Sequence, residues 1–264
     1  MVTMYSDAQC PCSAQFVADV KHLLDHPQLR DALDFQQFFE PKCNDALPHC
    51  KKAQPDPQLF QCIHGDEECL GHRYFLCAQH LAMPGASGAP SYRNSTKWLD
   101  FQACSYGTCM QCDVFTELAC LTPCTTYTSF TKPGQNDIME TCAAQVGLDW
   151  AALQACAAPN SSLAQALQVA SARACIDRRA TYGTRGLPVV DVGATRVSTS
   201  QALPLFCGPT PLEFLTTVCG ELEERARGAG AVLSAVAGVP PACANTTTMC
   251  GIIANSSRIP ACKG

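Results

Sequence analysis

Cysteine is the residue that most constrains the fold of this chain, because 20 of its 264 residues are cysteine. An even count at this density, without the spacing of a zinc finger, predicts disulfides that form in an oxidising compartment. N-glycosylation sequons agree with that compartment, and they begin at Asn94, Asn160, Asn245 and Asn255. The sequence therefore predicts a glycoprotein of the secretory route, either lysosomal or secreted.

The length and charge of the chain limit its organisation and its partners. The length allows one large domain or two small ones, so the cysteines are not needed to rescue a very small core. The net charge is −5 and no basic stripe is present, which argues against nucleic acid as a partner. The longest weakly polar run, residues 228–241, is too short and too rich in glycine to span a bilayer. No signal peptide is visible, and we expect that one has been removed.

Residues 2–16, VTMYSDAQCPCSAQF, give the clearest indication of chemistry. A β-type run leads through a turn to Cys10, Pro11 and Cys12, and an apolar helical pattern begins at once. Pro11 suits the first turn of a helix, where its missing N–H leaves no bond unmade. The N-terminus of a helix favours a thiolate over a thiol, and the thiolate is the attacking species. This predicts a thiol–disulfide exchange site with Cys10 as nucleophile and Cys12 as resolving cysteine, whereas a structural role is the alternative.

The rest of the chain predicts an interrupted α/β (α+β) fold. A second strand is expected at residues 32–40, and a mostly helical, cysteine-rich segment follows it. A short buried-type strand at residues 189–193, a hairpin partner at residues 195–198 and a closing helix at residues 211–226 come much later. This order is typical of a thioredoxin-like fold that is interrupted by a long helical insertion.

The same patterns divide the chain into four parts and add one residue to the predicted site. Pro188 precedes the third core strand, where a thioredoxin-like fold needs a proline, usually cis, that faces the redox pair. It would expose the backbone of Leu187 to an extended substrate, so we assign Pro188 to the catalytic site. The predicted parts are the first half of the thioredoxin-like domain (1–61), a helical cysteine-rich insertion (62–180), the second half of the domain (181–227) and a disulfide-stapled tail (228–264).

A longer motif lies at residues 62–77, with the sequence CIHGDEECLGHRYFLC. It resembles the signature CQHGxxECxxNxxxxC of the gamma-interferon-inducible lysosomal thiol reductases, the GILT family. Two positions depart from the signature, because Ile63 replaces glutamine and His72 replaces asparagine. The positions that agree are Cys62, His64, Gly65, Glu68, Cys69 and Cys77.

The resemblance implies a thiol–disulfide oxidoreductase of the lysosomal route. Such an enzyme acts on the disulfides of protein substrates through a mixed disulfide, and small thiols reduce it again. We expect no cofactor and no metal. Weaker similarities at residues 137–142 and 187–193 follow in the family's order, and the resemblance covers about residues 2–219.

The cysteine pair itself departs from the family pattern, which is CxxC. Aligning from Tyr5 places Cys12 at the second family cysteine and Gln9 at the first, so the role of nucleophile falls to Cys10. A disulfide across one residue closes a smaller ring, and departure from preferred geometry makes a disulfide easier to reduce. We therefore expect a more oxidising pair than that of CxxC relatives, better suited to oxidation or isomerisation. In an acidic lysosome, the pKa of the Cys10 thiol would have to be strongly lowered.

The cysteines can also be interpreted in ways other than a redox enzyme, and Asp7 has a structural interpretation. A zinc site could use Cys62, His64, Cys69, His72, Cys77 and His80, although structural disulfides are the expected fate of these cysteines. Cys109 and Cys112 form a true CxxC, but no strand is predicted before them. The chain could also be a secreted, disulfide-rich binding protein that kept the fold and lost the enzyme. Asp7, close to the pair, is interpreted as a turn residue.

Overall fold

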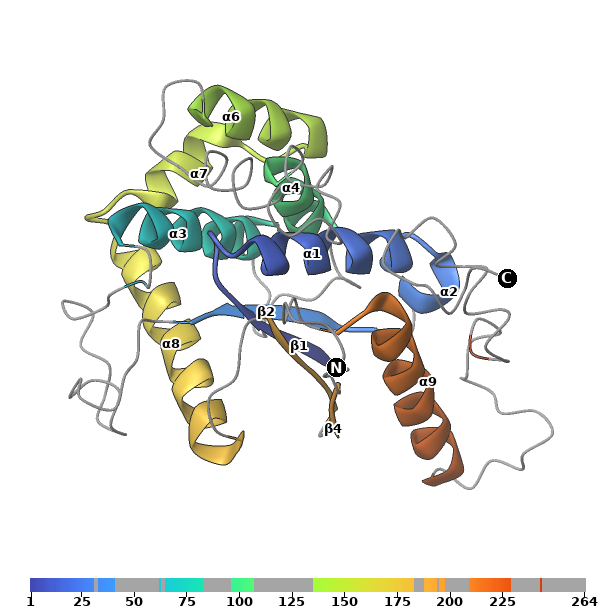
Figure 1. Cartoon of the computed structure of the whole chain (residues 1–264). Helices are drawn as coiled ribbons and strands as arrows, with labels where there is room; N and C mark the ends of the chain where they lie inside the picture. Colours follow the sequence, from blue (N-terminus) through green and yellow to red (C-terminus); the bar gives the residue numbers. More distant parts are fainter. Residues whose placement is uncertain are drawn as a thin grey trace, which may run out of the picture.

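The sheet of this protein mixes parallel and antiparallel strands and lies among helices (Figure 1). The computed structural model describes residues 1–30, 33–40, 62, 65–82, 96–106, 135–182, 188–193, 195–197, 209–228 and 243. Within these residues the strands are β1 (Val2–Ser6), β2 (Phe35–Phe39), β3 (Val189–Val192) and β4 (Thr195–Arg196). The helices there are α1 (Pro11–Leu24), α2 (Pro27–Arg30), α3 (Asp66–Leu81), α4 (Lys97–Ser105), α6 (Gln135–Val146), α7 (Trp150–Ala157), α8 (Ser162–Tyr182) and α9 (Pro211–Gly228).

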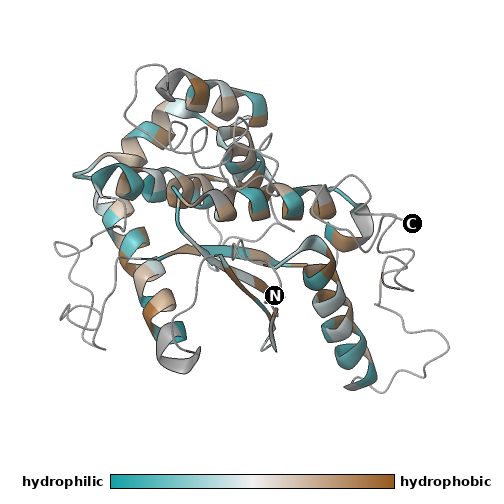
Figure 2. Cartoon of the chain, in the orientation of Figure 1, coloured by the Kyte–Doolittle hydropathy of each residue, from teal (hydrophilic) through white to brown (hydrophobic). Residues whose placement is uncertain are grey.

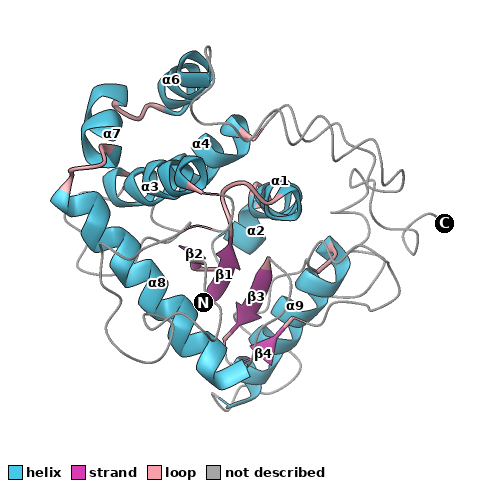
Figure 3. Ribbon diagram, turned by 60° about the vertical axis from the view of Figure 1, so that its left-hand side comes forward, coloured by secondary structure: helices cyan, strands magenta, loops and turns pink. Residues whose placement is uncertain are grey.

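Strand β1 is an inner strand of this sheet. The order of the described strands is β2-β1-β3-β4; β1 is parallel to β2 and antiparallel to β3, and β4 closes a hairpin with β3. In Figures 1 and 3, α8 and α9 lie on opposite sides of these strands. The mixed α+β class predicted from the sequence is confirmed, while the thioredoxin-like arrangement stays a prediction.

Helix α1 and strand β2 follow the two periodicities that their sequences predict. In β2, Phe35, Gln37 and Phe39 are buried and the residues between them are half-buried, which is the alternation of a strand. The Phe16 ring of α1 meets the Phe214 ring of α9 edge-on, with ring centroids 5.7 Å apart. Figure 2 shows that the C-terminal turns of α9, at the end away from α1, are mostly hydrophilic. The apolar face of α1 is fully buried through Phe16, Val17, Val20, Leu23 and Leu24.

The described residues between β2 and β3 are mostly helical, as predicted, and disulfides cross-link these helices. Helix α3 contacts α4, α7 and α8. One disulfide joins Cys77 of α3 to Cys156 of α7, and another joins Cys104 of α4 to Cys142 of α6. Trp98 of α4 stacks on Phe35 of β2 at 5.8 Å between ring centroids. The insertion therefore shares one hydrophobic core with the sheet.

The expected attachment of the C-terminal tail is confirmed for one cysteine. Cys243 forms a disulfide with Cys219 of α9. Cys250 and Cys262 lie outside the described residues. Among the helices that the structure describes, none is both long enough and apolar enough to cross a membrane.

A buried ion pair fixes α8 to the sheet. Arg178 of α8 donates two hydrogen bonds to Asp191 of β3, from Nε to Oδ2 at 2.6 Å and from Nη2 to Oδ1 at 2.8 Å. The guanidinium also lies 4.7 Å from the centroid of the Tyr5 ring in β1. The two charged side chains are only 6% and 13% exposed. Removing one partner would leave the other charge buried without its counter-ion.

We therefore expect Arg178→Ala to lower the free energy of unfolding by about 3 kcal/mol. Arg173→Ala is the matched control, because Arg173 is an exposed arginine of the same helix, and its loss should cost less than about 0.5 kcal/mol. Urea unfolding followed by circular dichroism measures both values. Equal losses in the two variants would contradict the role of the Arg178–Asp191 pair.

Candidate active site

The predicted strand–turn–helix junction is present at the end of β1. Cys10 is the N-cap of α1, and its carbonyl accepts a hydrogen bond from the Ala14 N–H at 3.1 Å. The Cys10 N–H donates to the Asp7 carbonyl at 3.3 Å, which confirms Asp7 as a turn residue. The Asp7 N–H donates to the Ser13 hydroxyl at 3.4 Å. The turn therefore presents Cys10 at the N-terminus of a helix, as the sequence indicates.

The two cysteines of the CPC pair are not bonded to each other. Cys10 carries a thiol and is half-buried. Cys12 is disulfide-bonded, and its partner is therefore a cysteine other than Cys10. The Cys10–Cys12 disulfide on which the expected potential depends is thus not formed in this state. The assignment of these cysteines as the redox pair stays a prediction, and exchange between them would first require the Cys12 disulfide to open.

The expected lowering of the Cys10 pKa is wrong for this state. Burial raises the pKa of the Cys10 thiol above its ordinary value, and the negative charge of Asp7 acts in the same direction. Hydrogen bonds from the backbone and side chain of Ser13, and from the backbone of Cys12, lower it. The N-terminus of α1 therefore helps the thiolate as predicted, but the loss of hydration outweighs that help.

This balance predicts the pH dependence of Cys10 alkylation. Only the thiolate reacts with iodoacetamide, so its rate should keep rising by about tenfold for each pH unit between about pH 7 and pH 9. An ordinary cysteine in a short peptide, with a pKa of about 8.5, should level off within that range. Peptide mapping by mass spectrometry measures the rate at Cys10 itself. A plateau below about pH 8 would contradict a raised pKa.

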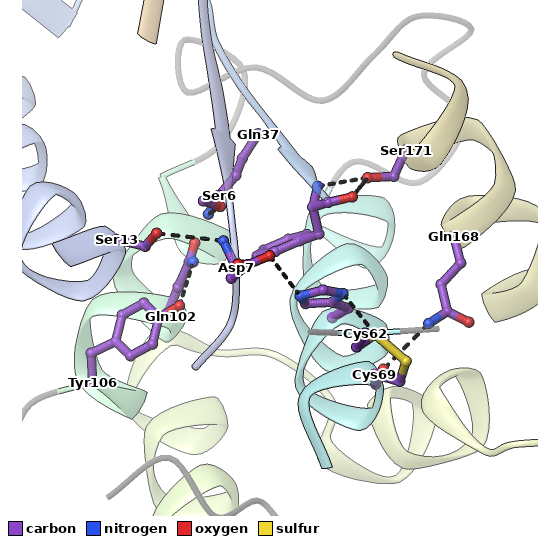
Figure 4. Close-up of polar contacts among 12 residues, drawn as sticks. Ser6, Asp7, Ser13, Gln37, Cys62, Cys69, Gln102, Tyr106, Gln168 and Ser171 are labelled. Carbon is purple, nitrogen blue, oxygen red and sulfur yellow. Dashed lines mark hydrogen bonds and ion pairs between the residues drawn. A yellow bond between two sulfur atoms is a disulfide. The ribbon is translucent and has the colours of Figure 1, made fainter. Parts of the chain in front are cut away.

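A buried polar cluster lies behind the turn (Figure 4). The side chains of Asp7 and His72 are 4% and 0% exposed, and the His72 Nε2 atom lies 4.0 Å from the Asp7 Oδ1 atom. The His72 Nδ1 atom lies 3.5 Å from the Sγ atom of Cys62. The Phe39 ring of β2 stacks on the imidazole at 4.8 Å. In Figure 4 the dashed lines can be followed from Asp7 through the imidazole to Cys62.

The start of α3 places the imidazole in this cluster. Gly65 is the N-cap of α3 with a φ of 92°, a backbone conformation that favours glycine. A disulfide between Cys62 and Cys69 spans this start. Gln168 of α8 donates to the Cys69 carbonyl at 3.3 Å, and the imidazole lies about one turn after that disulfide. Helix α8 therefore holds the N-terminal part of α3 beside the β1–α1 turn.

Structural disulfides, not thiolates, are present at the cysteines of the possible zinc site. Cys62 is bonded to Cys69, and Cys77 is bonded to Cys156, which confirms the prediction for these cysteines. Side-chain atoms of Cys62, Glu68 and His72 do approach within 4.8 Å of one another. Zinc binds cysteine as a thiolate, so the oxidised Cys62 does not fit the metal. His64 lies outside the described residues.

Pro188 lies at the end of the strands where the CPC turn also lies. It is buried and directly precedes β3. The antiparallel pairing places Val189 opposite Tyr5, near the end of β1 that leads to Cys10. The topology therefore brings Pro188 and the turn to one edge, while a catalytic role for Pro188 stays a prediction. Leu187 lies outside the described residues.

The remaining predicted positions lie far from this turn in the sequence. Asn160 is exposed in the turn between α7 and α8, where a glycan would have room. The other asparagines of the predicted sequons, and the CxxC of the insertion, lie outside the described residues: Asn94, Asn245, Asn255, Cys109 and Cys112.

A known protein family matches part of this chain. Residues 1–124 match the family model of the gamma interferon inducible lysosomal thiol reductases (GILT). These residues, slightly less than half of the chain, are similar to the GILT family. The GILT match contains the CPC turn and the signature of α3, and it supports a thiol reductase of the lysosomal pathway at the level of the family. No curated protein and no solved structure matches the chain.

Sequence reasoning missed the contact between Asp7 and His72. It considered His72 only as a departure from the GILT signature and as a possible zinc ligand. The two residues are 65 positions apart in sequence, and no local pattern joins them. The one available indication was the replacement of an uncharged asparagine by a titratable histidine within a motif that otherwise agrees.

Proposed function

We propose that this chain is a thiol–disulfide oxidoreductase that acts on protein disulfides, with Cys10 as its nucleophile. The observation that carries the proposal is the Cys10 thiol at the N-cap of α1, directly after β1. This position lies within the residues that match the GILT family. The N–H groups at the start of α1 face the position where the thiolate charge develops, and they lower its pKa.

The proposed reaction proceeds through a mixed disulfide. The Cys10 thiolate attacks one sulfur of a substrate disulfide, a Cys10–substrate disulfide forms, and the other substrate sulfur leaves as a thiolate. The Cys12 thiol, once a small thiol reductant has opened its own disulfide, attacks the Cys10 sulfur. This releases the second substrate thiol and forms a Cys10–Cys12 disulfide. The substrate gains two electrons, and a small thiol returns the pair to its reduced form.

We also propose a role for Pro188, a reduction potential for the cysteine pair and a cellular location. Pro188 lies at the sheet edge that carries the turn, where an extended substrate could pair with the adjacent backbone. A Cys10–Cys12 disulfide closes a small ring, so the pair would be more oxidising than CxxC and would favour oxidation or isomerisation. We place the protein in the lysosome or outside the cell, with glycans at its four sequons.

A binding protein without enzyme activity is the second candidate function. Two observations favour it: burial raises the pKa of the Cys10 thiol, and Cys12 is in a disulfide with another cysteine. Both features would keep the pair inactive unless a reductant opened the Cys12 disulfide. Such a protein would use the same disulfide-braced fold as a scaffold for a partner.

Reduction of insulin disulfides distinguishes the two functions. The full chain is incubated with insulin and a small thiol as electron donor, at acidic and at neutral pH. Faster reduction than with the small thiol alone supports the oxidoreductase. A rate equal to that of the small thiol alone, with a chain shown by circular dichroism to be folded, favours the binding protein.

A further inference from the structure

The imidazole of His72 lies between two hydrogen-bond acceptors. Its Nε2 atom faces the Asp7 carboxylate at 4.0 Å, and its Nδ1 atom faces the Cys62 sulfur at 3.5 Å. A disulfide sulfur carries no hydrogen, and an ionised carboxylate only accepts. The 4.0 Å separation between His72 Nε2 and Asp7 Oδ1 is too long for a hydrogen bond but is an ion-pair distance, so attraction between the two side chains requires the imidazolium. The arrangement therefore fits the protonated form of His72.

The charges around His72 also fit an imidazolium. A carboxylate oxygen of Glu68, on the same helix, lies within 4.8 Å of a ring nitrogen. Tyr106 of α4 is buried near the same groups: burial raises its pKa, a hydrogen bond from Gln102 lowers it, and the charges of Cys10, Asp7 and Glu68 raise it further. The titratable groups around His72 in this buried cluster are therefore acids. They come from the β1–α1 turn, from α3 and from α4.

Asp7 connects this cluster to Cys10. Its carboxylate opposes ionisation of the Cys10 thiol because two negative charges would then lie close together. A positive charge on His72 would compensate the Asp7 carboxylate, whereas a neutral imidazole would not. The charge of His72 therefore changes the cost of forming the thiolate, without any contact between His72 and the substrate.

We propose that His72 is a positioning residue for Cys10: when protonated, it pairs with the Asp7 carboxylate and offsets the negative charge that opposes the Cys10 thiolate. This inference rests on the proposed function, because it assigns how Cys10 becomes reactive in an acidic compartment. A rise in pH removes the charge of His72 and restores the full effect of Asp7. The GILT signature has an uncharged asparagine here, so this device is a feature of the present chain.

The test compares iodoacetamide alkylation of Cys10 in wild type and in His72→Asn, without any disulfide substrate. At about pH 5, we expect alkylation to be about tenfold slower in His72→Asn, because Asp7 is then uncompensated. At about pH 8, above the ordinary pKa of histidine, the two rates should agree within about twofold. His80→Asn is the matched control, since His80 is an exposed histidine of the same helix, and it should follow the wild type at both pH values.

A second background separates the electrostatic role from a structural one. Asp7→Asn should speed alkylation of Cys10 because it removes the opposing charge. In that background there is no Asp7 charge for His72 to offset, so adding His72→Asn should change the rate by less than about twofold. Equal wild-type and His72→Asn profiles overturn the proposal. A slowing by one constant factor at every pH, or a full effect of His72→Asn in the Asp7→Asn background, also overturns it.

Two further measurements keep the test decisive. If His72→Asn does not fold, His72→Gln and the NMR titration of the His72 Cε1–H resonance in wild type and Asp7→Asn replace it. A resonance that titrates at the same pH in both chains contradicts the pair. Insulin reduction is measured separately. An active wild type with indistinguishable alkylation profiles removes the role of His72 alone, whereas an inactive wild type with the expected profiles removes the oxidoreductase function alone.

Discussion

Replacing Cys10 by serine should reduce the insulin reductase activity by about two orders of magnitude or more, to the background rate of the small thiol. A serine hydroxyl stays protonated at these pH values and does not attack a disulfide, whereas a thiolate does. Cys10 is not in a disulfide, so the substitution breaks no cross-link and changes a single atom. The loss should therefore appear in the rate of reduction and not in the thermal stability of the chain.

Cys175→Ser provides the matched control for this result. Cys175 is the other described cysteine that carries a thiol, and it is 2% exposed in α8. Its replacement should leave the rate of insulin reduction unchanged. Cys12→Ser should instead accumulate a mixed disulfide between Cys10 and the substrate, visible as a band of higher mass in a non-reducing gel. Full activity of Cys10→Ser would contradict Cys10 as the nucleophile and would assign the activity to another cysteine.

Among the disulfides whose two cysteines the structure describes, removal of the one between α3 and α7 should cause the largest loss of stability. Cys77 and Cys156 are separated by 79 positions, and releasing a loop of that size should lower the free energy of unfolding by about 4 kcal/mol. The reason is that the unfolded chain regains the freedom that the cross-link had removed. The double variant Cys77→Ala/Cys156→Ala tests this by urea unfolding of the oxidised protein.

The disulfide at the start of α3 provides the comparison. Cys62 and Cys69 are separated by only 7 positions, so Cys62→Ala/Cys69→Ala should cost about 2 kcal/mol in the same experiment. Both double variants remove two buried cysteines, which makes the change in buried sulfur comparable. A greater loss in the short-loop variant would show that packing around His72, and not loop length, dominates the effect.

Local patterns in the sequence predicted most of the elements that position the candidate site. The strand at β1, the helix that starts at Pro11 and the later hairpin of β3 and β4 all follow from periodicity, proline and turn residues. These signals succeed because they depend on neighbours within a few residues. The GILT signature predicted the family on the same local basis, from one segment of 16 residues.

The disulfide partners and the reactivity of Cys10 could not be predicted in the same way. Twenty cysteines allow a very large number of pairings, and the choice of Cys156 for Cys77 depends on how α3 packs against α7. The burial that raises the pKa of Cys10 depends on the packing of the folded chain. A helix N-terminus is visible in the sequence, but the loss of hydration that outweighs it is not.

The sequence alone determined that this chain has a thiol at a strand-to-helix junction, a helical insertion braced by disulfides and a GILT signature. Each of these is encoded by residues that are close together in the chain. Only the tertiary structure decided that Cys12 bonds to a cysteine other than Cys10 and that His72 faces Asp7. The physical reason is that burial and charge act through space, so they depend on which segments the fold brings into contact.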